Sequence, residues 1–189
     1  MQLWVGLGNP GAQYALHRHN VGFMASDTIA EVHGFSPVQK KFQGWLQEGR
    51  IAGTKVLLLK PATYMNESGR SVGEALRFYK LDTDALTVFH DELDLAPFKV
   101  KVKQGGGTAG HNGLRSIDQH IGPDFRRVRI GIGHPGHKDR VTDYVLGNYA
   151  KSEQDALADT LGAIAAEAGW LAKGDDARFM NDVALRQAE

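Results

Sequence analysis

Five short polar residues stand where an imidazole, a carboxylate and three amides could act together. They are Asn9, His19, Asn66, Asp91 and Asn112, and each falls just past the expected end of a strand or at the start of a helix. In an open α/β sheet, loops at the carboxyl ends of the strands converge on one crevice. A base, an orienting carboxylate and amide donors suffice to activate water and stabilise an oxyanion. The pattern therefore predicts a hydrolytic site without a covalent nucleophile.

His19 is the expected general base, and Asp91 is its expected orienting partner. A carboxylate beside an imidazole fixes the tautomer and stabilises the imidazolium that forms on proton transfer. Two other interpretations stay open: Asp91 as a turn or helix cap, and a metal site. A metal site would use His17 and His19 with partners among His90, Asp91, Glu92 and Asp94. We expect no metal and no other cofactor.

A glycine motif near the N-terminus suggests a different class of enzyme. Residues Gly6–Gly11 match the G-x-G-x-x-G pattern of dinucleotide sites. However, Pro10 removes a backbone N–H that a pyrophosphate would use. The next helix begins only near Asn20, too late to follow the motif directly. The segment favours a tight turn that presents Asn9.

A second motif, Gly69–Gly73, matches the G-x-S-x-G elbow of serine esterases. Asp91 and His111 would complete the order of such a triad. The elbow needs a strand directly before its serine, and Ser71 lies instead inside a helical pattern. We interpret this match as a coincidence.

Composition is that of an ordinary globular domain. The apolar fraction is 42%, and there is no cysteine, which excludes disulfides and a thiol nucleophile. We see no signal peptide and no apolar run long enough to span a membrane, and we expect a cytoplasmic protein.

Net charge is zero, yet residues 99–129 hold seven basic and two acidic residues, a balance of +5. A local basic field on a neutral protein suits a partner with few phosphates, such as an RNA end.

Alternating strand and helix patterns predict a single domain over residues 1–189. The expected strands are 2–7, 45–51, 55–59, 86–89, 99–103 and 127–130. The expected helices are 21–32, 68–80, 114–121, a long one from a capping box at Ser152 to about 171, and a last one carrying Phe179 and Val183. This order favours a three-layer α/β/α sandwich around a twisted mixed sheet, with strand 99–103 antiparallel.

Cations alternate with apolar residues on two of these strands. Period 2 places Lys101 and Lys103 on one face of their strand, and Arg127 and Arg129 together on another strand. Lysines of this kind also protect a sheet edge. The arginines of the same parity favour a phosphate clamp. The glycine-rich stretch 105–113 between the two strands reads as a flexible loop leading into a helix N-terminus that can receive an anion.

Taken together, these segments resemble bacterial-type peptidyl-tRNA hydrolases. The matching segments are Gly6–Gly11 with Tyr14, Arg18–Gly22, Lys60–Gly69, His90–Leu95, Gly110–Leu114 and Arg129–Pro135. They occur in order over residues 1 to about 150, and the acidic C-terminal part matches only in character. One departure is Thr108-Ala109, where related sequences often carry His-Gly.

The resemblance implies a monomeric, metal-free enzyme that hydrolyses the ester between a peptide and the 3′-terminal ribose of tRNA. It implies that His19 activates water, that Asp91 orients it, and that Asn9 distinguishes blocked from free aminoacyl groups. The expected contacts to the substrate, its acceptor stem and its 3′ end are Tyr14, Tyr64, Met65, Asn66, His111, Asn112, Lys101, Lys103 and Arg129. The alternative is a protein that binds tRNA without cleaving it.

Overall fold

The centre of the molecule is a seven-stranded mixed sheet. In the computed structural model, which describes all residues 1–189, the strand order is β2-β3-β4-β1-β5-β7-β6. The strands are β1 (Gln2–Gly6), β2 (Gln39–Lys41), β3 (Gly44–Ile51), β4 (Thr54–Pro61), β5 (Leu86–Glu92), β6 (Val100–Gln104) and β7 (Arg126–Gly131). Strands β4, β1, β5 and β7 run parallel, and antiparallel strands flank them on both sides. The predicted mixed sheet and the antiparallel Lys-rich strand are confirmed.

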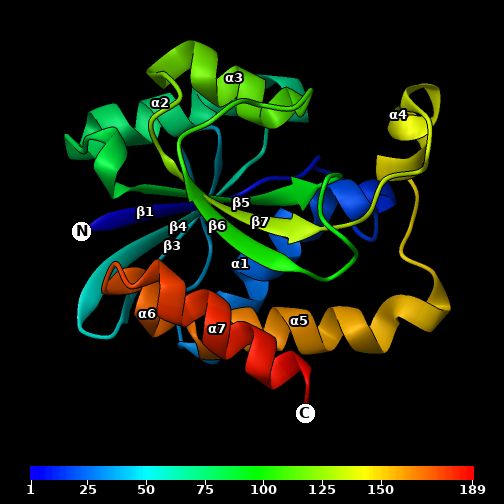
Figure 1. The fold of residues 1–189 in the computed structure, drawn as a ribbon. Helices are drawn as coiled ribbons and strands as arrows, with labels where there is room; N and C mark the ends of the chain where they lie inside the picture. The colour runs from blue at the N-terminus through cyan, green and yellow to red at the C-terminus, as the bar shows by residue number, and fades with distance from the viewer.

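Helices cover both faces of this sheet, which confirms the predicted three layers (Figure 1). On one face lie α2 (Ser68–Tyr79) and α3 (Asn112–Ile121). On the other lie α1 (Val21–Val32), α5 (Gln154–Ala166), α6 (Ala168–Ala172) and α7 (Asp176–Gln187). The short helix α4 (Val141–Val145) stands apart from both layers. None of the helices is both long and apolar enough to cross a membrane.

The first strand shows how the sequence builds two apolar cores. Successive strand residues point to opposite faces of a sheet. Leu3 and Val5 pack in the core below α2 and α3, whereas Trp4 packs in the core on the side of α1 and α5, and all three side chains are buried. Because both faces are covered, β1 contains almost no polar residue.

Two glycines allow α1 to lie directly against the strands. A Cβ at Gly6 would fall 2.3 Å from the carbonyl oxygen of Gly22, and a Cβ at Gly22 would fall 2.3 Å from that of Phe89. The first glycine of the apparent dinucleotide motif therefore serves close packing of helix on strand. That packing places the start of α1, just after His19, at the carboxyl ends of β1 and β5.

The structure corrects three predicted boundaries. Strand β5 continues through His90 and Asp91, which pair with β7, so Asp91 lies within the end of the strand and not beyond it. The long C-terminal helix is divided at Glu167, whose carboxylate accepts hydrogen bonds from Trp170 and Arg186. The capping box at Ser152 is also wrong, because a 3-10 turn over Lys151–Glu153 precedes α5.

Candidate active site

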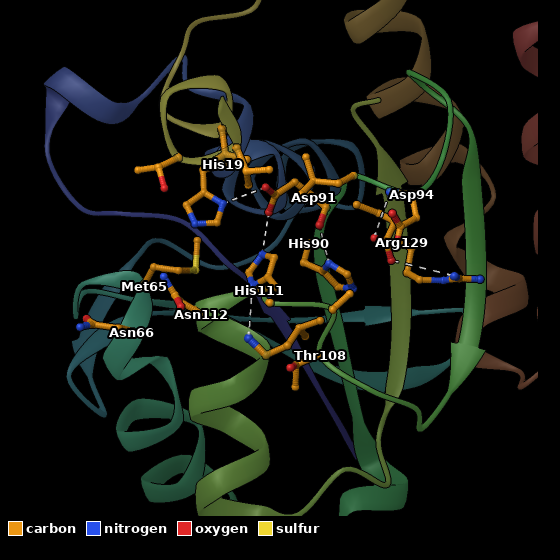
Figure 2. A pocket seen from close by; sticks show the side chains of 18 of the residues that line it. His19, Met65, Asn66, His90, Asp91, Asp94, Thr108, His111, Asn112 and Arg129 are labelled. Atoms are coloured by element: carbon orange, nitrogen blue, oxygen red, sulfur yellow. Dashed lines mark hydrogen bonds and ion pairs between the residues drawn. The ribbon is translucent and has the colours of Figure 1, made fainter. Parts of the chain in front are cut away.

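A buried chain of three side chains lies at the carboxyl end of the sheet. Asp91, near the end of β5, stands between the two imidazoles of His19 and His111 (Figure 2). His19 Nδ1 is 2.8 Å from Asp91 Oδ2, and His111 Nε2 is 2.7 Å from Asp91 Oδ1. Both carboxylate oxygens are therefore engaged. The predicted His19–Asp91 pair is present. Asp91 also binds a second imidazole, that of His111, which the resemblance had placed at the side of the cleft.

The hydrogen bonds of His111 define its tautomer. Its Nδ1 accepts hydrogen bonds from the backbone N–H groups of Gly113 (3.1 Å) and Leu114 (3.2 Å), so it caps α3. A nitrogen that accepts cannot carry the proton in the neutral ring, so Nε2 carries it and donates to Asp91. His19 likewise donates from Nδ1 to Asp91. Its Nε2 keeps a free lone pair, as a general base requires.

Burial and charge set the protonation of this group. Burial raises the pKa of Asp91, but the charges of His19 and His111 and the hydrogen bonds from both outweigh it and hold the pKa well below its usual value. Burial lowers the pKa of His19, but the charge of Asp91 and the hydrogen bond to it outweigh burial, so the pKa of His19 is raised above its usual value. Asp91 therefore stays ionised, and its charge favours the protonated form of His19.

His90 packs behind Asp91 and His111. The sequence indicated it only as a candidate metal ligand. Its ring is buried, its Nδ1 is 2.7 Å from the backbone oxygen of Asp91, and it packs edge-on against His111 with ring centroids 5.2 Å apart. Burial, together with the charge of His111, lowers the pKa of His90 to about 3. It is a neutral packing group for the carboxylate segment.

The residues that could bind a metal in the structure differ from those predicted from the sequence. The facing nitrogen and carboxylate atoms of His19, Asp91 and His111 lie within 4.8 Å of one another, which is close enough for a metal ion to bridge them. Their pairwise distances of 2.7 and 2.8 Å are those of direct hydrogen bonds. His17 and Asp94 do not belong to this set.

Asn9 is held so that one part of its amide remains for a ligand. Its backbone N–H donates to Asn20 Oδ1 and its backbone oxygen accepts from Asn20 Nδ2, each at 2.9 Å. Its Oδ1 accepts the backbone N–H of Met65 at 2.8 Å. Asn9 lines the cleft, and its Nδ2 is the donor that these contacts leave for it. Asn20, which fixes this geometry, has no chemical signature in the sequence beyond its place after His19.

A cleft of about 920 Å³ contains these groups. Its lining includes Tyr64, Met65, Asn66, Asn112, Lys103 and Arg129, together with Asn9, His19, Asp91 and His111. Asn66 points to the outer edge of the cleft, away from Asp91, whereas Met65 and Asn112 lie nearer His111 (Figure 2). Of the predicted residues, Tyr14 and Lys101 do not line the cleft; Tyr14 packs edge-on against His17. The cleft also has an apolar wall that the sequence patterns did not indicate, formed by Leu93, Val141, Val145 and Leu146.

The cations of β6 and β7 divide into two roles. Lys101 pairs with Arg129 across the two strands, and Lys103 pairs with Arg127. Arg127, however, is buried and donates to the carbonyl oxygens of Gly106, Gly107 and Pro123. It fixes the base of the glycine-rich loop, so its prediction as part of a phosphate clamp is wrong.

The serine-esterase alternative fails on geometry. Ser71 lies within α2 with no exposed surface, and its hydroxyl donates to the carbonyl oxygen of Phe42 at 2.6 Å. A nucleophilic serine must reach its base and its substrate. Ser71 instead attaches α2 to the segment after β2.

Comparisons with known proteins agree with this geometry. The model of the family described as "Peptidyl-tRNA hydrolase" matches residues 3–189. A protein of that name from Novosphingobium aromaticivorans is 84% identical over 99% of this chain and 98% of its own length. One from Zymomonas mobilis is 65% identical over 99% of both chains. The crystal structure of peptidyl-tRNA hydrolase from Acinetobacter baumannii superimposes with a TM-score of 0.91 at 43% identity, covering 97% of this chain and 94% of the other.

Proposed function

The chain belongs to the peptidyl-tRNA hydrolase family and is a carboxylic-ester hydrolase, and we propose that His19 is the general base of its reaction. The observation that carries this proposal is the buried His19–Asp91–His111 chain, which leaves only Nε2 of His19 free toward the cleft. The substrate is peptidyl-tRNA, in which an ester joins the carboxyl end of a peptide to the terminal ribose. Hydrolysis releases the peptide and returns the tRNA for use in translation.

In the proposed reaction, His19 Nε2 takes a proton from a water as its oxygen attacks the ester carbonyl carbon. The carbonyl electrons move to oxygen and form a tetrahedral oxyanion, which an amide donor stabilises. Collapse of this intermediate re-forms the carbonyl and breaks its bond to the ribose 3′-oxygen. The imidazolium of His19 returns the proton to that oxygen. No covalent intermediate with the enzyme forms.

Asn9 is the proposed reader of the peptide side of the ester. Its Oδ1 is occupied by the Met65 N–H, so it presents the donor Nδ2 to the cleft. A peptide carbonyl accepts from this donor, whereas the ammonium of a free aminoacyl group can only donate. Asn66 and Asn112, at the rim and near His111, are the proposed contacts for substrate and water, and the exposed ring of Tyr64 supports the 3′ end.

Lys101, Lys103 and Arg129 form the proposed contact to the acceptor stem. They lie on neighbouring strands at one side of the cleft, and Lys103 and Arg129 also line it. Oε1 of Glu92 lies 4.0 Å from Nη1 of Arg129. We further propose that the enzyme acts as a monomer in the cytoplasm.

Charge reversal at these cations should weaken binding of tRNA and leave the chemistry intact. Lys103→Glu or Arg129→Glu should raise KM for N-acetyl-aminoacyl-tRNA and lower the salt dependence, because each phosphate contact contributes about one unit to the salt slope. Lys55→Glu, which makes the same change of charge in the distant β4, is the control. Steady-state kinetics at several salt concentrations measure the effect. Equal losses on a short ester without tRNA would contradict the assignment.

The reaction itself is tested with two substrates. The enzyme should release the amino acid from N-acetyl-aminoacyl-tRNA and leave the unblocked aminoacyl-tRNA intact. Cleavage is measured with and without EDTA, because the same assay then reports whether a metal bound by the histidine–carboxylate set is needed. Equal cleavage of both substrates would contradict the role of Asn9. Salt-sensitive tRNA binding without cleavage would instead indicate a protein that binds tRNA but does not hydrolyse it.

A further inference from the structure

Arg18 joins the segment of the catalytic histidine to a part of the chain more than a hundred residues away. Its Nη2 lies 3.2 Å from Glu153 Oε1, and its Nη1 donates to the carbonyl oxygen of Tyr144 at 3.4 Å. Its guanidinium carbon stands 4.4 Å from the ring centroid of Tyr144 and 5.6 Å from that of Tyr149. The side chain is 14% exposed. An arginine so enclosed holds a fixed geometry, since both of its terminal nitrogens have partners and its plane contacts aromatic rings.

The backbone reinforces this connection on both sides of Arg18. The Arg18 N–H donates to the Gly147 carbonyl at 3.0 Å, and the Tyr149 N–H donates to that of Leu16 at 3.2 Å. A Cβ at Gly147 would lie 3.1 Å from Arg18 Nη1, so a glycine lets the two segments approach closely. The loop before His19 and residues 144–149 thus form one joined unit.

The joined unit includes one wall of the cleft. Val141, Val145 and Leu146, in and just after α4, line the cleft together with the polar groups of β5. Helix α4 stands away from both helical layers (Figure 1), so the sheet alone does not hold it. The Tyr144 hydroxyl donates to the carbonyl oxygen of Ile132 just after β7, and Arg18 packs on the same ring. These two contacts set the distance between this wall and His19.

Glu153 supplies the anchor on the side of the C-terminal helices. Its Oε1 accepts the backbone N–H of Ala150 at 2.8 Å as well as the guanidinium of Arg18. It therefore holds the chain between α4 and α5 while it pairs with the arginine. This gives one acidic residue of the C-terminal region a defined task at the active site.

We propose that Arg18 is a positioning residue: with Glu153 and Tyr144, it fixes the α4 wall and the His19 loop relative to each other, so that a bound ester meets the base at the correct angle. The inference rests on the proposed function of His19. Arg18 does not line the cleft, so it acts through its neighbours and not on the substrate. Its loss should reduce the rate of the chemical step more than the binding of tRNA.

The test compares Arg18→Gln, Arg18→Lys and Glu153→Gln with the wild type. A small misplacement of reacting groups costs up to about 100-fold in rate, so kcat should fall about 10- to 100-fold in Arg18→Gln. Arg18→Lys should lie between, because an ammonium keeps the charge but not the planar stacking. KM should stay within about twofold, as expected when ground-state binding is unchanged. The midpoint of the acid limb should not move, because Asp91 and not Arg18 shifts the pKa of His19.

Arg178→Gln is the matched control. Arg178 also stacks on an aromatic ring, at 4.1 Å from Trp170, and pairs with an acid, Asp182, but lies on α7 outside the cleft. Its kinetics should equal those of the wild type. Thermal unfolding of each variant checks the fold. If Arg18→Gln does not fold, Arg18→Lys and Glu153→Gln test the same inference, and each should lower kcat by a smaller factor. The amide of Glu153→Gln can still accept the hydrogen bond from Ala150.

Three results would overturn the inference. The first is an unchanged kcat in folded Arg18→Gln, and the second is a raised KM with kcat intact. The third is an Arg18→Gln/Glu153→Gln double variant whose losses simply multiply, since a shared link requires the double variant to be little worse than Arg18→Gln alone. A His19→Ala reference in the same assay separates this failure from a failure of the proposed function. If that variant remained active, the base assignment itself would be wrong.

Discussion

Replacement of His19 by alanine should remove most of the turnover of N-acetyl-aminoacyl-tRNA. General-base assistance contributes about 10²- to 10⁴-fold, and the structure offers no second base in the same place. Both ring nitrogens of His111 are already engaged, Nδ1 with the start of α3 and Nε2 with Asp91. His90 is buried behind the carboxylate. We therefore expect kcat to fall by about that factor, with KM nearly unchanged.

The fold should survive this change. Asp91 keeps its hydrogen bond from His111, so the carboxylate is not left without a donor. Losing one hydrogen bond to a charged group costs about 1.5–3 kcal/mol. His19→Gln serves as a second variant, because its amide offers Asp91 a donor but is no base. His33→Ala, in a histidine that binds the Ala165 carbonyl far from the cleft, is the control. Full activity in folded His19→Ala would refute the assignment.

The sheet and its two cores were predictable because they follow from local patterns. Alternation places Leu3 and Val5 on one side of β1 and Trp4 on the other. Such patterns record which face of an element is buried. The position of His19 and Asp91 at the carboxyl end followed from the order of strands and helices.

The missed features depend on contacts between distant segments. Alternation gives Arg127 and Arg129 the same parity, yet the carbonyl groups of Gly106, Gly107 and Pro123 take up only Arg127. The predicted long C-terminal helix is interrupted at Glu167, which is not a helix-breaking residue type. Its carboxylate accepts hydrogen bonds from Trp170 and Arg186 at this point. No periodicity encodes such partners, so the sequence indicates the type of residue and not its contact.

His111 shows the same limit within the active site. Its place before a helix was visible, but its double role was not. It caps α3 through Nδ1 and donates to Asp91 through Nε2, and this second contact joins residues 20 positions apart. The consequence is chemical: both oxygens of Asp91 are occupied by donors, so the carboxylate orients His19 and is not itself free to take a proton.

Asp91→Asn should therefore affect the rate and the pH profile together. The charge of Asp91 raises the pKa of His19 against the lowering effect of burial. Without that charge only burial remains, so the pKa should fall below 6.5 and the acid limb of kcat should move to lower pH. The rate on the plateau should still fall by about 10²-fold or more, because an amide can donate to Nδ1 and favour the tautomer that carries its proton on Nε2.

The two effects distinguish an orienting carboxylate from a merely structural one. A general loss of packing would lower activity at every pH without moving the acid limb, and it would lower the thermal unfolding temperature in step. Asp155→Asn, an equal change of charge at the exposed start of α5, should alter neither quantity. Profiles of kcat between pH 5 and 9 for the wild type, Asp91→Asn and Asp155→Asn distinguish the two roles. An acid limb in Asp91→Asn that coincides with the wild type would mean that Asp91 does not set the protonation of His19.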